Sequence, residues 1–315
     1  STIKQEQPMT QTSKLDRRDF LKTTALATGA LTSCPTSLLR AADDADPYGG
    51  FKMAIQSYSL RAFDVDEALQ HSQKLGLKYW EGFSGHIPMS TVPSHVKEQR
   101  AKFDDAGITL LAYGVLNFDD NETKTREIFD FAQAMSLVSI SANPKKEAAV
   151  FDLLDKMVEE YGIPIAIHNH GPGATYDKIE DVVKWTKDRH PLIGACVDTG
   201  HYLRSDEDPV EAIDRLQGRV FGVHLKDVKT IRDANEQASL KAELPEGAFK
   251  RLQKEGKLMT ILGEGELDVP GCLKSLRAQN YDRSLSLEYE ENMENPLSDI
   301  EICLKTVRDA VKQIG

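Results

Sequence analysis

Short apolar runs recur along this chain, and between them apolar positions return every three or four residues. Runs of this length, rich in β-branched side chains, are typical of buried strands, and the stretches between them have the period of helices packed on a sheet. Strands that alternate with helices form a parallel sheet. The predicted strands span residues 52–56, 78–81, 109–113, 138–141, 164–168, 194–198, 220–224 and 284–288.

Helical stretches fill the gaps between these strands, and glycines such as Gly76 and Gly107 supply the left-handed residue that ends a helix. The clearest examples lie at residues 65–75, 123–135, 146–161, 179–188, 209–216 and 269–279. Eight strand–helix units fit a closed (β/α)8 barrel better than an open sheet. We therefore predict an α/β fold, a single-domain TIM barrel over residues 46–315, preceded by a separate N-terminal segment over residues 1–45.

Four of the predicted strands end on side chains that bind metal ions. In chain order these are His168, Asp198, His224 and Glu288. The C-terminal ends of parallel barrel strands meet at one face, which is where active sites are built. Two imidazoles and two carboxylates at that face predict that the four side chains share one metal ion.

Other polar side chains follow these strand ends and are candidates for contact with a substrate. His170 comes two residues after His168 but already belongs to the loop, so we choose His168 as the ligand. His201 follows Asp198 by three residues and can reach a substrate oxygen or orient a ligand. The ordinary alternatives are a structural histidine and an aspartate that caps the next turn.

Lys226 shares one side of its strand with His224, because side chains alternate along a strand. A cation beside the metal would stabilise an enolate or alkoxide, and Glu288 would serve as the proton acceptor. The alternative is an exposed lysine paired with Asp227. Three aromatic residues could stack on a sugar ring: Trp80, Phe83 and Tyr113.

A long polar segment, residues 227–283, separates the last two strands and contains Gly263-Glu264-Gly265. Two glycines around one residue can cradle a phosphate or form a tight turn. We favour the tight turn, because the Lys and the Ser or Thr of a nucleotide-binding loop are missing.

Composition narrows the class of protein. With 40% apolar and 28% charged side chains in 315 residues, the chain has the composition of a globular protein. A formal net charge of −11 argues against a polyanionic partner, so we expect no nucleic acid. Four widely spaced cysteines suggest neither a disulfide framework nor a cysteine-rich zinc site.

The N-terminus resembles a bacterial twin-arginine export signal. Arg17 and Arg18 precede Asp19-Phe20-Leu21-Lys22 and a mildly apolar run over residues 23–39, which is too short and polar for a membrane span. The resemblance implies export to the periplasm or another extracytoplasmic compartment, without stable membrane insertion of the mature domain. The alternative is an amphipathic N-terminal helix, and both cleavage near Ala41 and a lipoprotein site at Cys34 remain open.

The second half of the chain resembles the xylose isomerase-like TIM barrel superfamily, which includes sugar phosphate isomerases and epimerases and the apurinic endonucleases. The motifs that carry this resemblance are Asp198-Thr199-Gly200-His201, His224-Leu225-Lys226-Asp227, Gly263-Glu264-Gly265 and Leu287-Glu288-Tyr289-Glu290. The resemblance implies one divalent ion held by Glu, Asp, His and Glu from strands five to eight, and an acid near the substrate at Glu81. It is also compatible with a homo-oligomer.

One position departs from the superfamily pattern, since His168 stands where the first Glu is expected. An imidazole keeps a metal ligand but removes one of the two carboxylates that epimerases of this kind use on opposite faces of the substrate. The site becomes less anionic, which favours manganese, zinc, cobalt or iron over magnesium.

These observations lead to the hypothesis of an exported metal-dependent sugar isomerase or epimerase that acts through an enediolate on a keto- or aldo-sugar. Its expected catalytic residues are Glu288, Glu81, His201 and Lys226. β-Elimination from a keto-glycoside passes through the same species and is the first alternative. A non-catalytic sugar-binding protein and a phosphodiester-cleaving endonuclease are alternatives of other classes.

Overall fold

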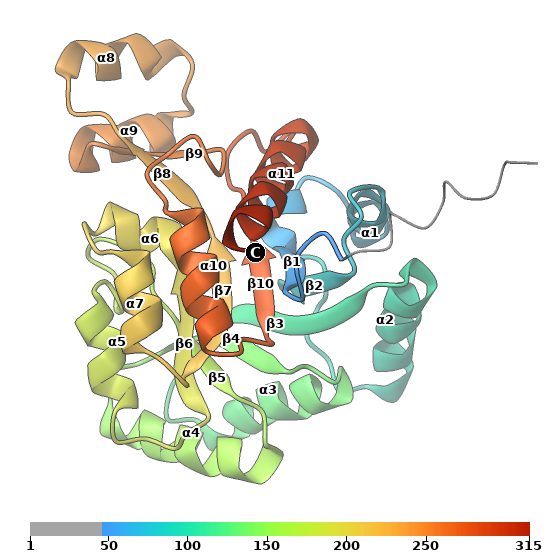
Figure 1. Ribbon diagram of the computed structural model, residues 1–315. Coiled ribbons are helices and arrows are strands. Elements are labelled where there is room, and N and C mark those ends of the chain that lie inside the picture. Colours follow the sequence, from blue (N-terminus) through green and yellow to red (C-terminus); the bar gives the residue numbers. More distant parts are fainter. Residues whose placement is uncertain (1–45) are drawn as a thin grey trace, which may run out of the picture. The chain divides into compact units, whose positions relative to one another are not determined.

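Eight parallel strands close into a barrel within residues 46–315, the part of the chain that this computed structural model describes (Figure 1). The barrel order is β1-β10-β7-β6-β5-β4-β3-β2, which confirms the predicted TIM barrel. The predicted N-terminal segment, with its export signal, lies outside the described residues. The barrel strands are β1 (Lys52–Gln56), β2 (Tyr79–Gly82), β3 (Thr109–Phe118), β4 (Ser139–Pro144), β5 (Ile165–His168), β6 (Ile193–Asp198), β7 (Val220–Leu225) and β10 (Ser284–Leu287).

Helices surround the barrel, and the six stretches predicted as helical are helices whose ends differ from the prediction by at most two residues. The Asp64 side chain caps α1 in a reciprocal box with Glu67, and Gly107 ends α2 with a φ of 62°. The helices beside the barrel are η1 (Ser57–Leu60), α1 (Val65–Lys74), α2 (Pro93–Ala106), α3 (Glu122–Ala134), α4 (Ala148–Tyr161), α5 (Ile179–Thr186), α6 (Thr199–Arg204), α7 (Pro209–Arg215), α10 (Val269–Ala278) and α11 (Leu297–Ile314).

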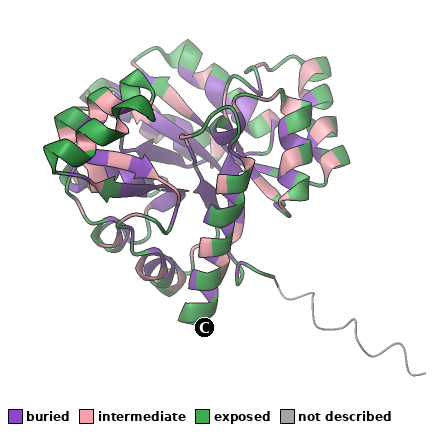
Figure 2. Cartoon of the chain, turned by 90° about the horizontal axis from the view of Figure 1, so that it is seen from above, coloured by how far each residue is buried: buried purple, intermediate pink, exposed green. Residues whose placement is uncertain are grey.

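Apolar side chains fill the layer between strands and helices, so burial is greatest on the strands, while most exposed residues lie on the outer helix faces and in the loops (Figure 2). The interior of the barrel is polar instead. Ser141 on β4, Ser286 on β10 and Glu81 on β2 are at most 1% exposed and meet across the barrel. The small serines leave room for the longer carboxylate to cross toward β7. Among the described residues, no helix is both long and apolar enough to cross a bilayer.

The largest difference from the sequence prediction is an excursion between β7 and α10. There β8 (Asp227–Thr230) pairs antiparallel with β9 (Lys257–Thr260), and α8 (Ala234–Ser239), η2 (Leu240–Ala242) and α9 (Glu246–Glu255) connect them. The helices of this excursion stand outside the barrel (Figure 1, top left). A second difference is that β3 continues to Phe118 instead of ending at residue 113.

Candidate metal centre

The four predicted ligands converge at the C-terminal ends of β5, β6, β7 and β10. Asp198 and His224 are paired residues of neighbouring strands, and Glu288 directly follows β10. One nitrogen or oxygen from each of His168, Asp198, His224 and Glu288 lies within 4.8 Å of the other three. The convergence that the sequence predicted is therefore present, while the binding of an ion stays a prediction.

The donor atoms of this cluster fit a cation. His224 Nδ1 lies 3.1 Å from His168 Nε2 and 3.0 Å from Glu288 Oε2. Asp198 Oδ2 lies 3.2 Å from His168 Nε2. Two imidazole nitrogens at this distance require a shared proton or a cation between them. Two nitrogens and two carboxylate oxygens are a common ligand set for a divalent transition metal.

Asp198 is held in place by its neighbours on both sides. Asn169 exchanges two hydrogen bonds with its backbone, at 2.8 and 2.9 Å, and the His201 backbone N–H donates to Asp198 Oδ1 at 2.8 Å. Its Oδ2 is thereby left facing the cluster. Burial alone would raise the pKa of Asp198, but the surrounding histidines and the ammonium of Lys226 lower it well below its usual range. The carboxylate is thus ionised at neutral pH.

Lys226 lies within the cluster, buried and surrounded by carboxylates. Its Nζ is 2.8 Å from Glu288 Oε2 and 3.2 Å from Asp198 Oδ2, and it also forms an ion pair with Glu290. Burial alone would lower the pKa of Lys226, but these three carboxylates raise it well above its usual value. Lys226 is therefore a permanent cation, and the alternative of an exposed lysine paired with Asp227 is wrong.

Glu81 lies beneath the cluster, away from the substrate face. Its Oε2 is 3.0 Å from His224 Nε2, the ring nitrogen opposite the one that faces the other ligands. Ser141 and Ser286 donate to its two oxygens at 2.6 and 2.7 Å. Burial alone would raise the pKa of Glu81, but His224 and these hydroxyls lower it. Such a carboxylate orients a metal-binding imidazole, so this position does not support the expected proton exchange with substrate.

His201 presents one fixed tautomer. Its Nδ1 lies 3.0 Å from Arg204 Nη1, and Glu255 binds Arg204 through two contacts of 2.8 Å. An arginine only donates, so Nδ1 must accept and the ring proton is on Nε2, which lies 4.0 Å from Asp198 Oδ2. Burial outweighs the pull of Asp198 and lowers the pKa of His201 well below its usual range. His201 is thus a neutral hydrogen-bond donor.

Sequence reasoning did not identify Arg204 or Glu255. The only local signal was that Arg204 follows His201 by one helical turn on α6. Glu255 ends α9 in the excursion, and nothing in its sequence context indicates that it reaches the barrel.

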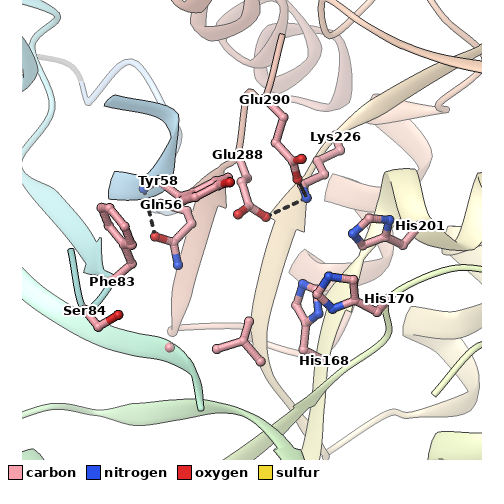
Figure 3. Close-up of a pocket in the computed structure, with 12 residues that line it drawn as sticks. Gln56, Tyr58, Phe83, Ser84, His168, His170, His201, Lys226, Glu288 and Glu290 are labelled. Carbon is pink, nitrogen blue, oxygen red and sulfur yellow. Dashed lines mark hydrogen bonds and ion pairs between the residues drawn. The ribbon is translucent and has the colours of Figure 1, made fainter. Parts of the chain in front are cut away.

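A cavity of about 270 Å³ opens over the cluster. Figure 3 shows the aromatic rings on one side, the histidines and Lys226 on the other, and the two glutamates between them. The residues that line it are Gln56, Tyr58, Phe83, Ser84, Gly114, Val115, His168, His170, His201, Lys226, Glu288 and Glu290. Asp198, His224 and Glu81 are not among them, so substrate would meet this metal centre from the side of His168 and Glu288.

The aromatic candidates divide between cavity and core. Phe83 lines the cavity and makes an edge-to-face contact with Tyr58, at a distance of 5.4 Å between ring centroids. Tyr58 also lines the cavity but was not among the residues expected from the sequence. Trp80 and Tyr113 are fully buried, with their polar atoms bonded to Ser72 and to the backbone of Ile87, so their expected sugar contact is wrong. A buried ring needs such a partner for its polar atom.

His170 lies in the loop after β5, as predicted, and stacks on His201 with a centroid distance of 4.8 Å. The His170 side chain is exposed on one side, but its inner part is desolvated. This desolvation, together with the neighbouring His168, lowers the pKa of His170 to about 4. The ring is neutral at pH 7 and contributes hydrogen-bonding capacity without charge.

The Gly263-Glu264-Gly265 loop binds an anion that belongs to the protein itself. The backbone N–H groups of Gly263 and Gly265 donate to Asp227 Oδ2 at 2.9 and 3.0 Å, and that of Leu267 donates to Oδ1 at 2.9 Å. A Cβ on Gly265 would lie 2.2 Å from Asp227 Oδ1. The loop is therefore a tight turn around a buried carboxylate, as the sequence favoured, and its amides are not free for a phosphate.

Known proteins are similar to this chain in sequence or in structure. An inosose dehydratase of Clostridium botulinum is 30% identical over 151 residues. This match covers 46% of this chain and 47% of that relative, so the chain spans about half the length of the relative. A crystal structure of an uncharacterized protein from Parabacteroides distasonis has a TM-score of 0.59 at 25% identity, over 82% of this chain and 99% of that one. The crystal structure of IolI with a bound zinc atom has a TM-score of 0.60 at 18% identity, over 84% and 99%.

Residues 144–306, about half of the chain, match the family described as xylose isomerase-like TIM barrel. This range includes all four converging ligands, the Lys226 ion pairs and the Asp227-centred turn. With its eight-stranded barrel and its match over this range, the chain belongs to the xylose isomerase-like TIM barrel family.

Proposed function

We propose that this protein is a metal-dependent lyase that removes water or another β-substituent from a cyclic polyhydroxy ketone. One observation carries the proposal: a single carboxylate of the ligand cluster, Glu288, reaches the cavity, and the opposite side is aromatic. A two-base epimerase needs carboxylates on both faces of its substrate. Elimination needs one base and a way to stabilise the departing oxygen, and both are present on one side.

Glu288 is the base in this proposal. A carboxylate that gives one oxygen to a ligand cluster keeps a second oxygen that can accept a proton from the carbon next to the ketone. The pKa of Glu288 is lowered, because Lys226 and His224 outweigh the effect of burial, so the group is ionised when substrate arrives. The protonated Glu288 then delivers this proton to the departing hydroxyl as its carbon–oxygen bond breaks. The products are an enone and water, and Glu288 returns to its starting form.

Lys226 and His201 act on oxygen atoms. The Lys226 ammonium lies 2.8 Å from Glu288 Oε2, beside the carbonyl oxygen on which negative charge develops after proton removal. His201 is neutral and has its proton on Nε2, so it donates a hydrogen bond to a substrate oxygen instead of transferring a proton. This role agrees with the expectation that His201 reaches a substrate oxygen.

His168, Asp198, His224 and Glu288 would hold a divalent cation, and Glu81 would orient His224 toward it. When bound, such a cation supplies a Lewis acid that polarises the ketone. A set of two imidazoles and two carboxylates favours zinc, manganese, cobalt or iron over magnesium. The inosose dehydratase relative supports the reaction type, and IolI with its zinc atom shares the fold.

Isomerisation by proton transfer along one face remains the second candidate, because Glu288 could return its proton to the neighbouring carbon. The two reactions separate in one experiment on the metal-loaded protein. With an inosose in deuterated water, we expect growth of the enone absorbance and release of water. Deuterium at the carbon of an isomeric ketone, without loss of water, would select the isomerase. Absence of both reactions across inososes and 3-keto-glycosides would refute the proposal.

A further inference from the structure

Among the residues that the structure describes, no Lys or Arg that lines the cavity is free of a carboxylate partner. Lys226 is the one Lys or Arg that lines it, and it is neutralised by Asp198, Glu288 and Glu290. A divalent ion in the cluster would bring the local charge close to zero rather than to a positive surplus, because three carboxylates besides Glu81 surround it.

Arginines near the cavity mouth are also engaged. Arg61 donates to the backbone oxygens of Tyr58 and Glu290, at 3.0 and 2.6 Å, while its guanidinium lies 4.4 Å from the Tyr58 ring centroid. Arg204 is held by Glu255 through two contacts of 2.8 Å and donates to His201 Nδ1 at 3.0 Å. Neither guanidinium presents the free fork that binds a phosphate or carboxylate.

The backbone sites at which TIM barrels bind phosphate are filled as well. Such sites form at the loops after the last strands and at helix N-termini. Here the amides of Gly263, Gly265 and Leu267 surround the Asp227 carboxylate, and Asp198 caps α6. Both places therefore already hold an anion of the protein.

The other side of the cavity suits an uncharged ring. Tyr58 is 38% exposed and Phe83 is half-buried, and together they form an apolar wall facing the ligand cluster (Figure 3). Aromatic faces pack on the C–H face of a cyclic polyol. Gln56 uses its side-chain oxygen to accept from the Tyr58 N–H at 3.2 Å, so its amide NH₂ is left to donate to a hydroxyl.

We propose that the site binds an uncharged, ring-shaped polyhydroxy ketone, with one ring face against Tyr58 and Phe83, and rejects phosphorylated and carboxylated counterparts. The reacting ketone rests on the proposed lyase function, whereas the preference for a neutral ring rests on the lining of the cavity alone. Unreactive polyols can therefore test the preference separately from the chemistry.

Binding and turnover are measured on the same metal-loaded protein. For binding, calorimetry or ligand-observed NMR compares myo-inositol with myo-inositol 1-phosphate, and methyl glucoside with methyl glucuronide. The neutral member of each pair should bind at least about tenfold more tightly, because the anion meets no free cation in the cavity and lies near the carboxylates of Glu288 and Glu290. For turnover, kcat/KM is compared between an inosose and its phosphate ester, with the same expected order.

Two variants locate the cause of the preference. Glu290→Gln removes one of the carboxylates that pair with Lys226. It should therefore reduce the difference in binding affinity between myo-inositol and myo-inositol 1-phosphate. Tyr58→Ala should weaken the binding of both neutral polyols at unchanged metal content. Tyr58→Phe, which keeps the aromatic ring, should weaken it less.

The outcomes separate this inference from the proposed function. Equal or tighter binding of the anionic member in both pairs overturns the neutral-ring inference, even if elimination occurs. Tighter binding of the neutral members with no turnover of any ketone supports the inference and refutes the lyase. Failure of all four polyols to bind overturns the inference.

Discussion

Glu288 is the residue at which the ligand cluster and the proposed base coincide. Its side chain is 10% exposed, and its carboxylate both belongs to the ligand cluster and lines the cavity. Glu288→Gln keeps the shape of the side chain but removes its charge and its basicity. We expect turnover to fall by about 10²–10⁴-fold and metal content to fall with it. Elemental analysis and the enone assay measure the two effects. Glu294→Gln, an exposed change near the same loop, is the control.

Glu81 offers a sharper residue-scale test, because its position separates orientation from catalysis. If it only orients His224, Glu81→Gln should weaken metal binding by about 10–100-fold, and saturating metal should restore most of the turnover. A metal titration of the purified variant, followed by kcat at saturation, measures both. Turnover that stays low at full metal occupancy would instead identify Glu81 as a proton-transfer group.

Residue types at strand ends made four of the site residues predictable, whereas geometry within the barrel decided the others. Parallel strands bring their C-terminal ends together, so four ligands could be found there: His168, Asp198, His224 and Glu288. The role of Glu81 depends on its register opposite Gln56 and on the small serines across the barrel. Local sequence carries neither fact. Tyr58 was missed for a related reason, since η1 follows β1 and aims it into the cavity.

At the scale of elements, eight strands and the helices between them were readable from periodicity, but the β8–β9 excursion was not. A single residue, Lys226, separates β7 from β8, and the partner strand β9 comes only after α8, η2 and α9. A four-residue strand whose partner is distant in sequence has no local pattern to mark it. β3 was underestimated because Gly114 and a register shift against β4 interrupt its pattern.

Asp227 joins these elements, since its carboxylate accepts from four backbone N–H groups. Two come from Val228 and Leu267, at 2.8 and 2.9 Å, and two from Gly263 and Gly265. Asp227→Ala should lower the free energy of unfolding by about 3 kcal/mol or more, because buried amides lose their acceptor. Denaturant unfolding measures the loss, and hydrogen exchange should show reduced protection at residues 263–267.

The matched control for Asp227 lies in the same excursion. Asp233 caps α8 through the N–H groups of Asn235 and Glu236, at 3.0 and 2.9 Å, but it is exposed. Asp233→Ala should cost about 1 kcal/mol. Equal losses for the two variants would contradict the view that Asp227 organises the turn.

At the scale of the whole molecule, closure of the barrel predicts that residues 46–315 are stable without residues 1–45. β1 pairs with β10 on one side and β2 on the other, so the first barrel strand has no open edge to be covered. A chain that starts at residue 46 should therefore have the same Tm as the full chain in thermal unfolding. A decrease of more than about 4 °C, roughly the effect of losing a few kcal/mol in a chain of this size, would show that residues 1–45 stabilise the barrel.

Export is proposed to depend on Arg17 and Arg18, which lie outside the described residues. An arginine pair read by an export receptor is not replaced by lysine, because the guanidinium fork differs from an ammonium while the charge is the same. In a bacterium with twin-arginine transport, we expect the full chain in the periplasmic fraction and R17K/R18K in the cytoplasm. We expect both proteins to unfold at the same temperature, because the two changes keep the charge and leave the sequence of residues 46–315 unaltered. Periplasmic R17K/R18K would contradict the proposal and favour the amphipathic-helix alternative.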